Sequence, residues 1–589
     1  MTISTSFWRS RSKKNAKERY PTVNAFTDDL RRHQAQQPIA ARPDSAWYRT
    51  TRFVARHRAA VAASTLAVAA LVSTTGVAVW QTTVATANAA RANKAAARSQ
   101  ATQKFLSSLF GNADPEKFKD STVSTQEILA RGRMTAESAF ADDPEALADV
   151  LSEIADIYAR AGSHEDALAV QQRRLAVLQA MPAANVNAVV DAQLALGQAL
   201  GTSSVSARNA EALPTLKAAQ VFAVERGADT RQQIWAQVLI ADQYRLERRL
   251  PEARAMMNEV LTRVSSEVAM PEKYLASVFA TSAAIARDEE RIDDARTQFA
   301  KSLEIDVSGK GRGPLEQTLT RTMLAQLDYD AGSYLSAAEQ ALKVVNLASD
   351  TLGDISSNLS PARRIVVLAY ERAGDIELAQ RYAQSLVDVE LSSRDVMRIA
   401  TAQLVLGRVA MTAGSLPEAG SYLNSARSSF AENLVWLARI EALSAELSLR
   451  NGNPEAALAT LTPILEKQLA RHAGPHVEVA RTREWLSVAE ARLGRWTDAQ
   501  TRMSLAAKTL GEVRKANHPT RVRCESYLVL LDPSRSLAER AVQLKALATH
   551  LAAGRQDQLP LVKSLQSIAA RLDAGFDPIA SPSLFPILE

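Results

Sequence analysis

The stretch AYERAGDIELA, Ala369–Ala379, decides the fold. It places a glycine five residues before an alanine, between two segments whose apolar residues recur at helical spacing. Glycine turns the chain easily, so the stretch is typical of a tight connection between two helices. Related stretches follow the same pattern: YARAGSHEDAL (158–168), DYDAGSYLSAA (328–338), VAMTAGSLPEA (409–419), SLRNGNPEAAL (448–458) and AEARLGRWTDA (489–499).

The alanine of this pattern recurs at nearly constant spacing. Its nine positions are Ala167, Ala212, Ala253, Ala295, Ala337, Ala379, Ala419, Ala457 and Ala499. The successive spacings are 45, 41, 42, 42, 42, 40, 38 and 42 residues. This regularity predicts one array of stacked helix pairs rather than the separate domains that the length alone would suggest.

The units resemble tetratricopeptide repeats in further positions. A small residue lies twelve positions before the alanine at Ala155, Ala241, Ala283, Ala325, Gly407 and Ala445, and fifteen before it at Gly197. A tyrosine lies nine before it at Tyr158, Tyr244 and Tyr370. The period is near 42 rather than about 34 residues, and the second to fourth units lack the turn glycine. We expect an all-α, tetratricopeptide-repeat-like α-solenoid with a period of about 42 residues, preceded by a single transmembrane helix.

The inner face of such a solenoid is a groove, where the resemblance implies a protein or peptide ligand. Candidate groove residues come from first-helix positions one and four past the small residue. They are Asp242, Arg245, Arg287, Gln326, Tyr329, Glu371 and Arg408. The alternative is that these are ordinary solvated side chains of helix surfaces.

The composition favours helix on helix and argues against a nucleic-acid partner. Hydrophobic residues make up 47 % of the chain and aromatic residues only 5 %. The net charge of +6 comes from residues 1–58, where 13 Lys and Arg face 4 Asp and Glu, a balance of +9 that leaves −3 for the rest. The repeats are therefore not basic, and no common nucleic-acid-binding motif is visible.

No catalytic, cofactor-binding or metal site is expected. The single Cys524 excludes an intrachain disulfide, and His472 and His476 are separated by Gly474 and Pro475, which break the helix that two ligands at this spacing would need. The stretch SGKGRGP (308–314) imitates a phosphate-binding loop but lacks the preceding strand and the Gly-Lys-Ser/Thr ending. We interpret it as a connection between repeats.

The uncharged run Ala59–Trp80 is long enough to cross a bilayer. Arginines are more frequent before it than after it, which predicts a cytoplasmic N-terminus and repeats on the periplasmic side of the inner membrane. A secreted, soluble repeat protein cleaved near Ala89 is the alternative, because Ala87–Ala89 fits a signal-peptidase site.

The predicted organisation follows from these features. It comprises a juxtamembrane segment at 1–58, the transmembrane helix at 59–80, a helical stalk at 81–124, the repeat array at 125–510, an irregular helical cap at 511–572 and an extended tail at 573–589.

The segment from Lys13 to Arg58 resembles the end of the catalytic domain, and the juxtamembrane part, of bacterial membrane-anchored Ser/Thr protein kinases with outer tetratricopeptide repeats. The matching elements are Arg19–Tyr20, VNAFTDDLRRH (23–33), Pro38–Ile39, Ala41–Arg42–Pro43 and YR…FVARHR within 48–58. The family's catalytic motifs would precede Lys13, so the resemblance implies its regulatory half with the catalytic domain missing.

We therefore expect a non-enzymatic, membrane-anchored sensor or scaffold that binds protein or peptide partners. A fragment of an intact transmembrane kinase remains the alternative from another class. A second copy of the chain or a kinase is a further candidate partner.

Overall fold

The computed structural model describes residues 20–35, 37–40, 45–111, 125–160, 163–182, 184–202, 206–266, 270–352, 356–393, 395–430, 434–472, 474–553 and 560–588. Within these ranges the regular structure is helical and no strand occurs, which confirms the all-α prediction. Residues 13–19 and 41–43, part of the kinase resemblance, lie outside the described residues. The chain divides into two compact units, Met1–Ala141 and Asp142–Glu589.

The first unit begins with a small helical cluster. Its helices are α2 (Val23–Gln34) and α3 (Ala46–Arg56), capped at their N-termini by the side chains of Thr22 and Ser45. Ile39 and Tyr48 form a small buried core with Tyr20 and Phe26. Asp29 accepts hydrogen bonds from the Tyr20 hydroxyl (2.9 Å) and the Ala40 amide (2.8 Å), so α2 is tied to the segment that leads toward α3.

The long helix α4 (Arg58–Gly111) follows directly, and α5 (Thr125–Ala139) completes the first unit. Its part from Arg58 to Thr86 is 29 residues long, apolar enough to cross a membrane, and wholly exposed. The candidate span found in the structure thus includes the run Ala59–Trp80.

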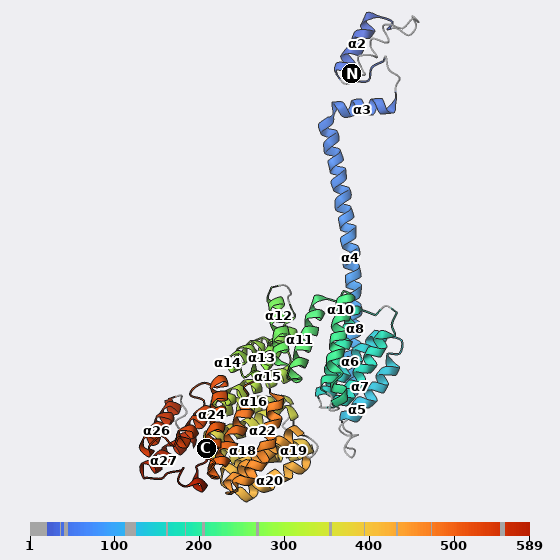
Figure 1. The fold of residues 1–589 in the computed structure, drawn as a ribbon. Coiled ribbons are helices and arrows are strands. Elements are labelled where there is room, and N and C mark those ends of the chain that lie inside the picture. The colour runs from blue at the N-terminus through green and yellow to red at the C-terminus, as the bar shows by residue number, and fades with distance from the viewer. Residues whose placement is uncertain are drawn as a thin grey trace. The chain divides into compact units, whose positions relative to one another are not determined.

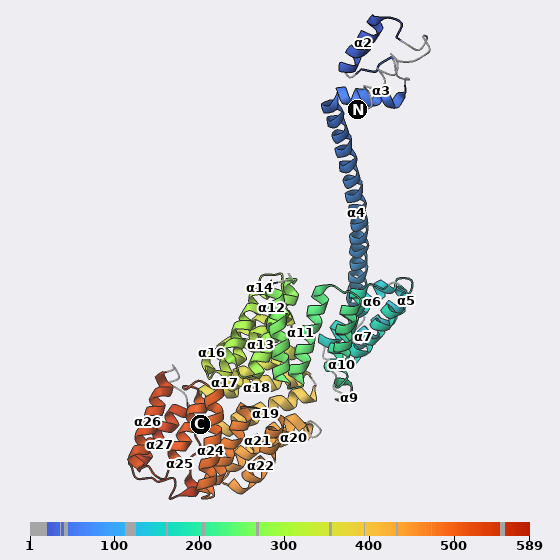
Figure 2. The ribbon, with the colours of Figure 1, turned by 45° about the horizontal axis from the view of Figure 1, so that its top comes forward.

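The second unit is a row of helix pairs (Figures 1 and 2). The helices are α6 (Pro144–Arg160), α7 (His164–Gln179), α8 (Val186–Gly201), α9 (Ser206–Asn209), α10 (Ala212–Glu225), α11 (Thr230–Leu246), α12 (Leu250–Ser266), α13 (Glu272–Asp288), α14 (Ile292–Val307), α15 (Pro314–Asp330), α16 (Tyr334–Leu352), α17 (Ser360–Ala373), α18 (Ile376–Ser393), α19 (Val396–Thr412), α20 (Leu416–Ser429), α21 (Leu434–Arg450), α22 (Pro454–Arg471), α23 (Val477–Arg492), α24 (Trp496–Val513), α25 (Pro519–Leu531), α26 (Leu537–Ala553) and α27 (Pro560–Asp573), with short 3-10 turns at Ser357–Leu359 and Pro582–Leu584. Each pair packs on the next, as in tetratricopeptide-like solenoids, and the predicted fold class is confirmed.

The packing explains why the repeat alanines must be small. All nine lie in the second helix of a pair and are buried. At two positions the small residue of the first helix is a glycine, and each of these glycines lies close to a side chain of the second helix. A Cβ at Gly197 would lie 2.6 Å from Cδ2 of Leu216, and one at Gly407 would lie 3.2 Å from Cβ of Tyr422.

The turns between paired helices share one backbone conformation. Gly332, Gly374, Gly414, Gly452 and Gly494 all have positive φ, between 74° and 85°. The third and fourth units keep this turn without glycine, because Arg248 (φ 64°) and Glu290 (φ 61°) occupy the same position. The missing glycines therefore do not mark missing turns.

The array curls until distant units touch. Arg514 after α24 binds Glu290 at 2.7 Å, and Lys515 binds Asp293 at 3.0 Å. Nearby, Nε2 of His518 lies 2.9 Å from the carbonyl oxygen of Asp330. A Cβ at Gly332 would lie only 2.5 Å from Cδ of Pro519, so the turn before α16 and the start of α25 are in direct contact.

The C-terminal residues fold back into this curl. Beyond α27 the chain turns through Pro582–Leu584, and the side chains of Phe585 and Leu588 are buried. The Leu588 amide donates to the Tyr527 hydroxyl (2.8 Å), and Nε of Arg492 donates to the Phe585 carbonyl (3.0 Å). Phe585 and Leu588 of the predicted extended tail (573–589) therefore contribute to the core, while the predicted domain boundaries stay predictions.

Candidate partner-binding site

One pocket lies on the inner side of the curl, where successive first helices each contribute side chains. Its lining comprises Tyr334, Glu371, Arg372, Arg408, Thr412, Glu446, Arg450, Trp485, Pro519, Thr520, Arg523, Pro560, Leu561 and Leu588. The empty space is about 640 Å³, part of it open to solvent, but the centre of a water molecule can occupy only about 50 Å³. The pocket thus accepts a small group, the size of a side-chain tip.

Glu371 is the most constrained acid of the pocket. Its carboxylate accepts hydrogen bonds from Arg408 Nη2 (3.2 Å) and from the Thr412 hydroxyl (2.8 Å). Burial opposes its ionisation, but Arg408 and Arg372 outweigh burial and lower the pKa of Glu371 to about 2. Two predicted groove residues, Glu371 and Arg408, are therefore an ion pair between α17 and α19.

Two further acids of the pocket region are paired with arginine. Glu446 pairs with Arg450 one turn later in α21 (3.2 Å). Arg523 of α25 donates to both carboxylate oxygens of Glu484 of α23, one of the bonds at 2.9 Å. Such bidentate pairs fix geometry as well as charge, so α25 is firmly attached to α23.

Arg481 of α23 has no such partner. Among the described residues it forms no hydrogen bond and no ion pair, although Glu446 is near enough to influence it. Burial first, and then the positive charges of Arg408 and Arg372, lower the pKa of Arg481 to about 10. The pocket lining holds four arginines (372, 408, 450 and 523) and two glutamates (371 and 446). Adding Glu484, which pairs with Arg523, and the neighbouring Arg481 gives five arginines against three glutamates, an excess of two positive charges.

The other predicted groove residues form a separate group nearer the start of the array. Arg245 bridges Asp242 (2.8 Å) and Asp288 (3.2 Å), and Arg287 also pairs with Asp288 (2.9 Å). The side chains of this network on α11 and α13 pair with one another. The structure does not bring it into the pocket.

Gln326 and Tyr329 of α15 behave differently from one another. Gln326 donates to Asp330 at 2.9 Å within its own helix. The ring of Tyr329 lies 5.3 Å from that of Tyr334, which lines the pocket, and Tyr329 is close enough to Arg408 and Arg481 to affect their ionisation. Tyr329 thus belongs to the edge of the pocket, and Gln326 does not line it.

Several pocket residues escaped the sequence analysis. Glu446 directly follows the small residue Ala445, so the spacing rule that selected Arg408 would have selected it too. Arg372 and Arg523, which line the pocket, carry no spacing signal. Neither does Arg481, which does not line the pocket but lies near enough to Arg408 and Arg372 for their charges to act on it. Only the curl of the array brings α25 and the C-terminal residues against α17 and α19, and pairwise repeat patterns do not encode that curvature.

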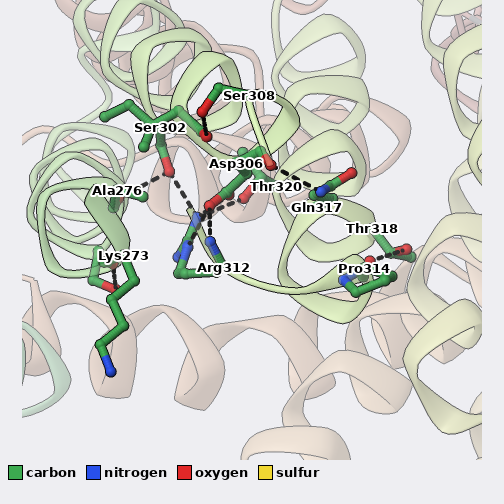
Figure 3. Close-up of polar contacts among 12 residues, drawn as sticks. Lys273, Ala276, Ser302, Asp306, Ser308, Arg312, Pro314, Gln317, Thr318 and Thr320 are labelled. Carbon is green, nitrogen blue, oxygen red and sulfur yellow. Dashed lines mark hydrogen bonds and ion pairs between the residues drawn. The ribbon is translucent and has the colours of Figure 1, made fainter. Parts of the chain in front are cut away.

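The loop 308–314 has a structural explanation that involves no phosphate (Figure 3). Arg312 donates to the buried Asp306 from its backbone amide (2.8 Å) and from Nη2 (2.7 Å), and Nη2 also reaches the Ser302 hydroxyl (2.7 Å). A Cβ at Gly311 would lie 2.5 Å from Cα of Asp306, so glycine permits this close approach. The loop connects α14 to α15, as expected from the sequence.

His472, His476 and Glu478 gather ligand atoms within 4.8 Å of one another. Nδ1 of His476 accepts the Glu478 amide (3.2 Å), which places the proton of the neutral ring on Nε2. The two rings are stacked at 3.7 Å, and burial lowers the pKa of both, that of His472 to about 4. By their spacing these three side chains could hold a metal ion, a grouping that the sequence analysis did not expect.

Comparisons with known proteins give structural neighbours only. No family model matches the chain, and no curated protein matches it. A Rap protein complexed with Competence and Sporulation Factor is 12 % identical, with 66 % of this chain and 100 % of that chain covered and a TM-score of 0.44. The apo form of the quorum sensor NprR from B. thuringiensis is 12 % identical, with 60 % and 99 % covered and a TM-score of 0.45. A putative kinesin light chain from Podosopora anserina with nearly identical TPR-like repeats is 18 % identical, with 34 % and 97 % covered and a TM-score of 0.27.

Proposed function

We propose that this chain is a membrane-anchored repeat protein whose inner pocket binds an anionic segment of a protein partner. The observation that carries the proposal is Arg481, an arginine without a counter-ion beside two further arginines. Arg481 is half-buried. A partly desolvated charge without a partner is costly, whereas a carboxylate that reaches it from the pocket would form charge-assisted hydrogen bonds. The binding role is that of a sensor or scaffold without catalysis.

The anchor is the part of α4 from Arg58 to Thr86. Its length, its apolar composition and its complete exposure favour a bilayer over water as its surroundings. Cleavage near Ala89 would have to occur inside the continuous helix Arg58–Gly111, which favours an uncleaved anchor. The arginine bias before the span orients the N-terminus to the cytoplasm and the repeats to the periplasm.

The relation to membrane-anchored Ser/Thr kinases is part of the same proposal. The helices α2 and α3, with Tyr20, Phe26, Ile39 and Tyr48 as their small core, lie in the chain directly before the span, in the place where the resemblance puts the end of a kinase domain. A partner bound by the repeats would then be coupled to a kinase on the other side of the membrane.

Membrane anchoring is tested by carbonate extraction of native membranes followed by an immunoblot for the repeats. A chain anchored by α4 stays in the membrane pellet.

A charge-class peptide screen tests the binding role. The full chain, in detergent micelles, is offered immobilised acidic, neutral and basic peptides of one common length and equal apolar content. The proposal predicts retention by acidic peptides that falls with added salt, since exposed ion pairs are screened. Retention without preference for acidic peptides would contradict it.

A further inference from the structure

The helix α3 (Ala46–Arg56) carries two features that the repeat array does not explain. It has a large apolar surface without a protein neighbour, because Trp47 is 79 % and Phe53 55 % exposed. It also carries three arginines within eleven residues and no acid. A soluble helix normally buries such aromatic side chains.

Phe53 lies between the apolar and the basic residues of α3. Trp47, Thr50 and Val54 follow the spacing i, i+3, i+7, so they share one face of the helix. Arg49, Arg52 and Arg56 follow the same spacing on the roughly opposite side; Arg52 is buried, whereas Arg49 and Arg56 are exposed at the edge next to Phe53. Tyr48, on the remaining side, is buried in the small core with Ile39.

The position of α3 in the chain identifies what covers the open face. His57 ends α3, and α4 starts at Arg58 with the candidate membrane span. Figures 1 and 2 show α3 running across the start of α4 rather than continuing it. A helix attached crosswise to the first residue of a span lies at the level of the lipid headgroups.

We propose that α3 lies flat on the inner leaflet and binds anionic phospholipids. Trp47 and Phe53 enter the boundary between headgroups and acyl chains, and the exposed Arg49, Arg56 and Arg58 contact lipid phosphates. Tyr48 keeps α2 packed on the cytoplasmic side of α3. The inference rests on the proposed membrane anchoring and adds a second, lipid-dependent contact to it.

Fluorescence of the full chain in vesicles tests this contact. The chain is reconstituted in phosphatidylcholine alone and in phosphatidylcholine with phosphatidylglycerol, with and without brominated acyl chains. The difference between the wild-type chain and Trp47→Phe isolates the emission of Trp47. The proposal predicts a blue-shifted Trp47 that brominated lipid quenches, more strongly with phosphatidylglycerol.

Two matched variants separate docking from mere tethering. A chain with Trp47→Phe and Gln34→Trp carries the probe at the end of α2 instead of on α3, and its added emission should resist quenching. Arg49→Gln with Arg56→Gln should lower the ratio of docked to undocked α3 by roughly fivefold for each arginine removed. Equal quenching at positions 34 and 47, or no effect of the arginine changes, would overturn the inference.

Carbonate extraction of the same samples keeps the two proposals apart. A chain that stays integrated while Trp47 remains unquenched refutes the docking of α3 and leaves the anchor standing. A chain that is washed off refutes the anchor, and the inference falls with it.

Discussion

Glu290 and Arg514 are 224 residues apart in the chain, yet Nη1 of Arg514 donates to Oε2 of Glu290 at 2.7 Å. Both side chains are largely buried. Glu290 stands at the turn position that other units fill with glycine, with φ at 61°. A left-handed backbone at a residue other than glycine or asparagine costs about 1–2 kcal/mol, so the ion pair offsets a local strain. This pair joins the fourth unit to the end of the array and helps to form the curl that builds the pocket.

Replacing Glu290 by glycine tests whether the ion pair with Arg514 outweighs the backbone strain at position 290. Glu290→Gly relieves the backbone but leaves the buried Arg514 without its acid, and we expect a net loss of about 1–3 kcal/mol in unfolding free energy. Arg248→Gly is the matched control, because Arg248 has the same turn geometry and only a 3.7 Å contact to Asp288. That variant should change stability by less than about 1 kcal/mol or stabilise the chain. Equal effects of the two substitutions in urea denaturation would refute the role of the pair.

The contact between Gly332 and Pro519 gives a second test of the curl. Gly332 and Gly414 have nearly the same φ, 82° and 84°, but a Cβ at Gly414 would meet nothing within 4 Å. Both alanine variants should lose about 1–2 kcal/mol from backbone strain. Gly332→Ala should lose a further 1–3 kcal/mol, roughly, from overlap with the proline ring. The same melting temperature for both variants would mean that the turn and α25 do not touch.

His518 makes the curl sensitive to acid. Burial first, and then Arg514, lower the pKa of His518 from 6.5 to about 3. Below pH 6.5 the unfolded chain binds a proton that the native chain refuses, so stability falls as the pH drops from 6.5 toward 3. The loss from this residue should reach about 2 kcal/mol at about pH 5.

The variant His518→Asn isolates that effect. Asparagine can still cap the Thr520 amide, as Nδ1 does now at 3.2 Å, but it loses the contact to Asp330 and does not titrate. It should be less stable than the wild-type chain by about 1 kcal/mol near neutral pH, and this deficit should vanish or reverse by about pH 5. Parallel stability curves against pH for the two proteins would contradict this account.

The C-terminal fold-back makes a prediction about two neighbouring residues. Phe585 is fully buried among Tyr527 and Trp496, whereas Leu584 beside it is 58 % exposed. Phe585→Ala should lower the unfolding free energy by about 3–5 kcal/mol, and Leu584→Ala by less than about 0.5 kcal/mol. Chemical denaturation measures the unfolding free energy of both variants. A loss for Phe585→Ala as small as that for Leu584→Ala would show that the C-terminal segment does not belong to the core.

The sequence predicts the local structure well and the curvature poorly. The alanine spacing identifies the helix pairs because each alanine must be small to pack against the adjacent helix. The burial of all nine alanines follows from that local packing. Arg248 and Glu290 show that one turn conformation tolerates different residues, so the absence of glycine was not informative. The pocket forms only where Arg523 and Leu588 come together with α17. Their meeting depends on small rotations between units, summed over many units, which the repeat pattern does not encode.

Titration of one acidic peptide against the full chain tests the central claim most directly. The acidic peptide best retained in the screen is labelled, and its Kd is measured by fluorescence anisotropy for the wild-type chain and for Arg481→Gln. Arg483→Gln is the control on the same helix, because Arg483 instead donates to Thr509 of α24. Loss of a charge-assisted contact should weaken binding about 10- to 100-fold for Arg481→Gln and leave the control unchanged. An affinity that is the same in all three proteins would contradict the assignment of the pocket as an anion-binding site.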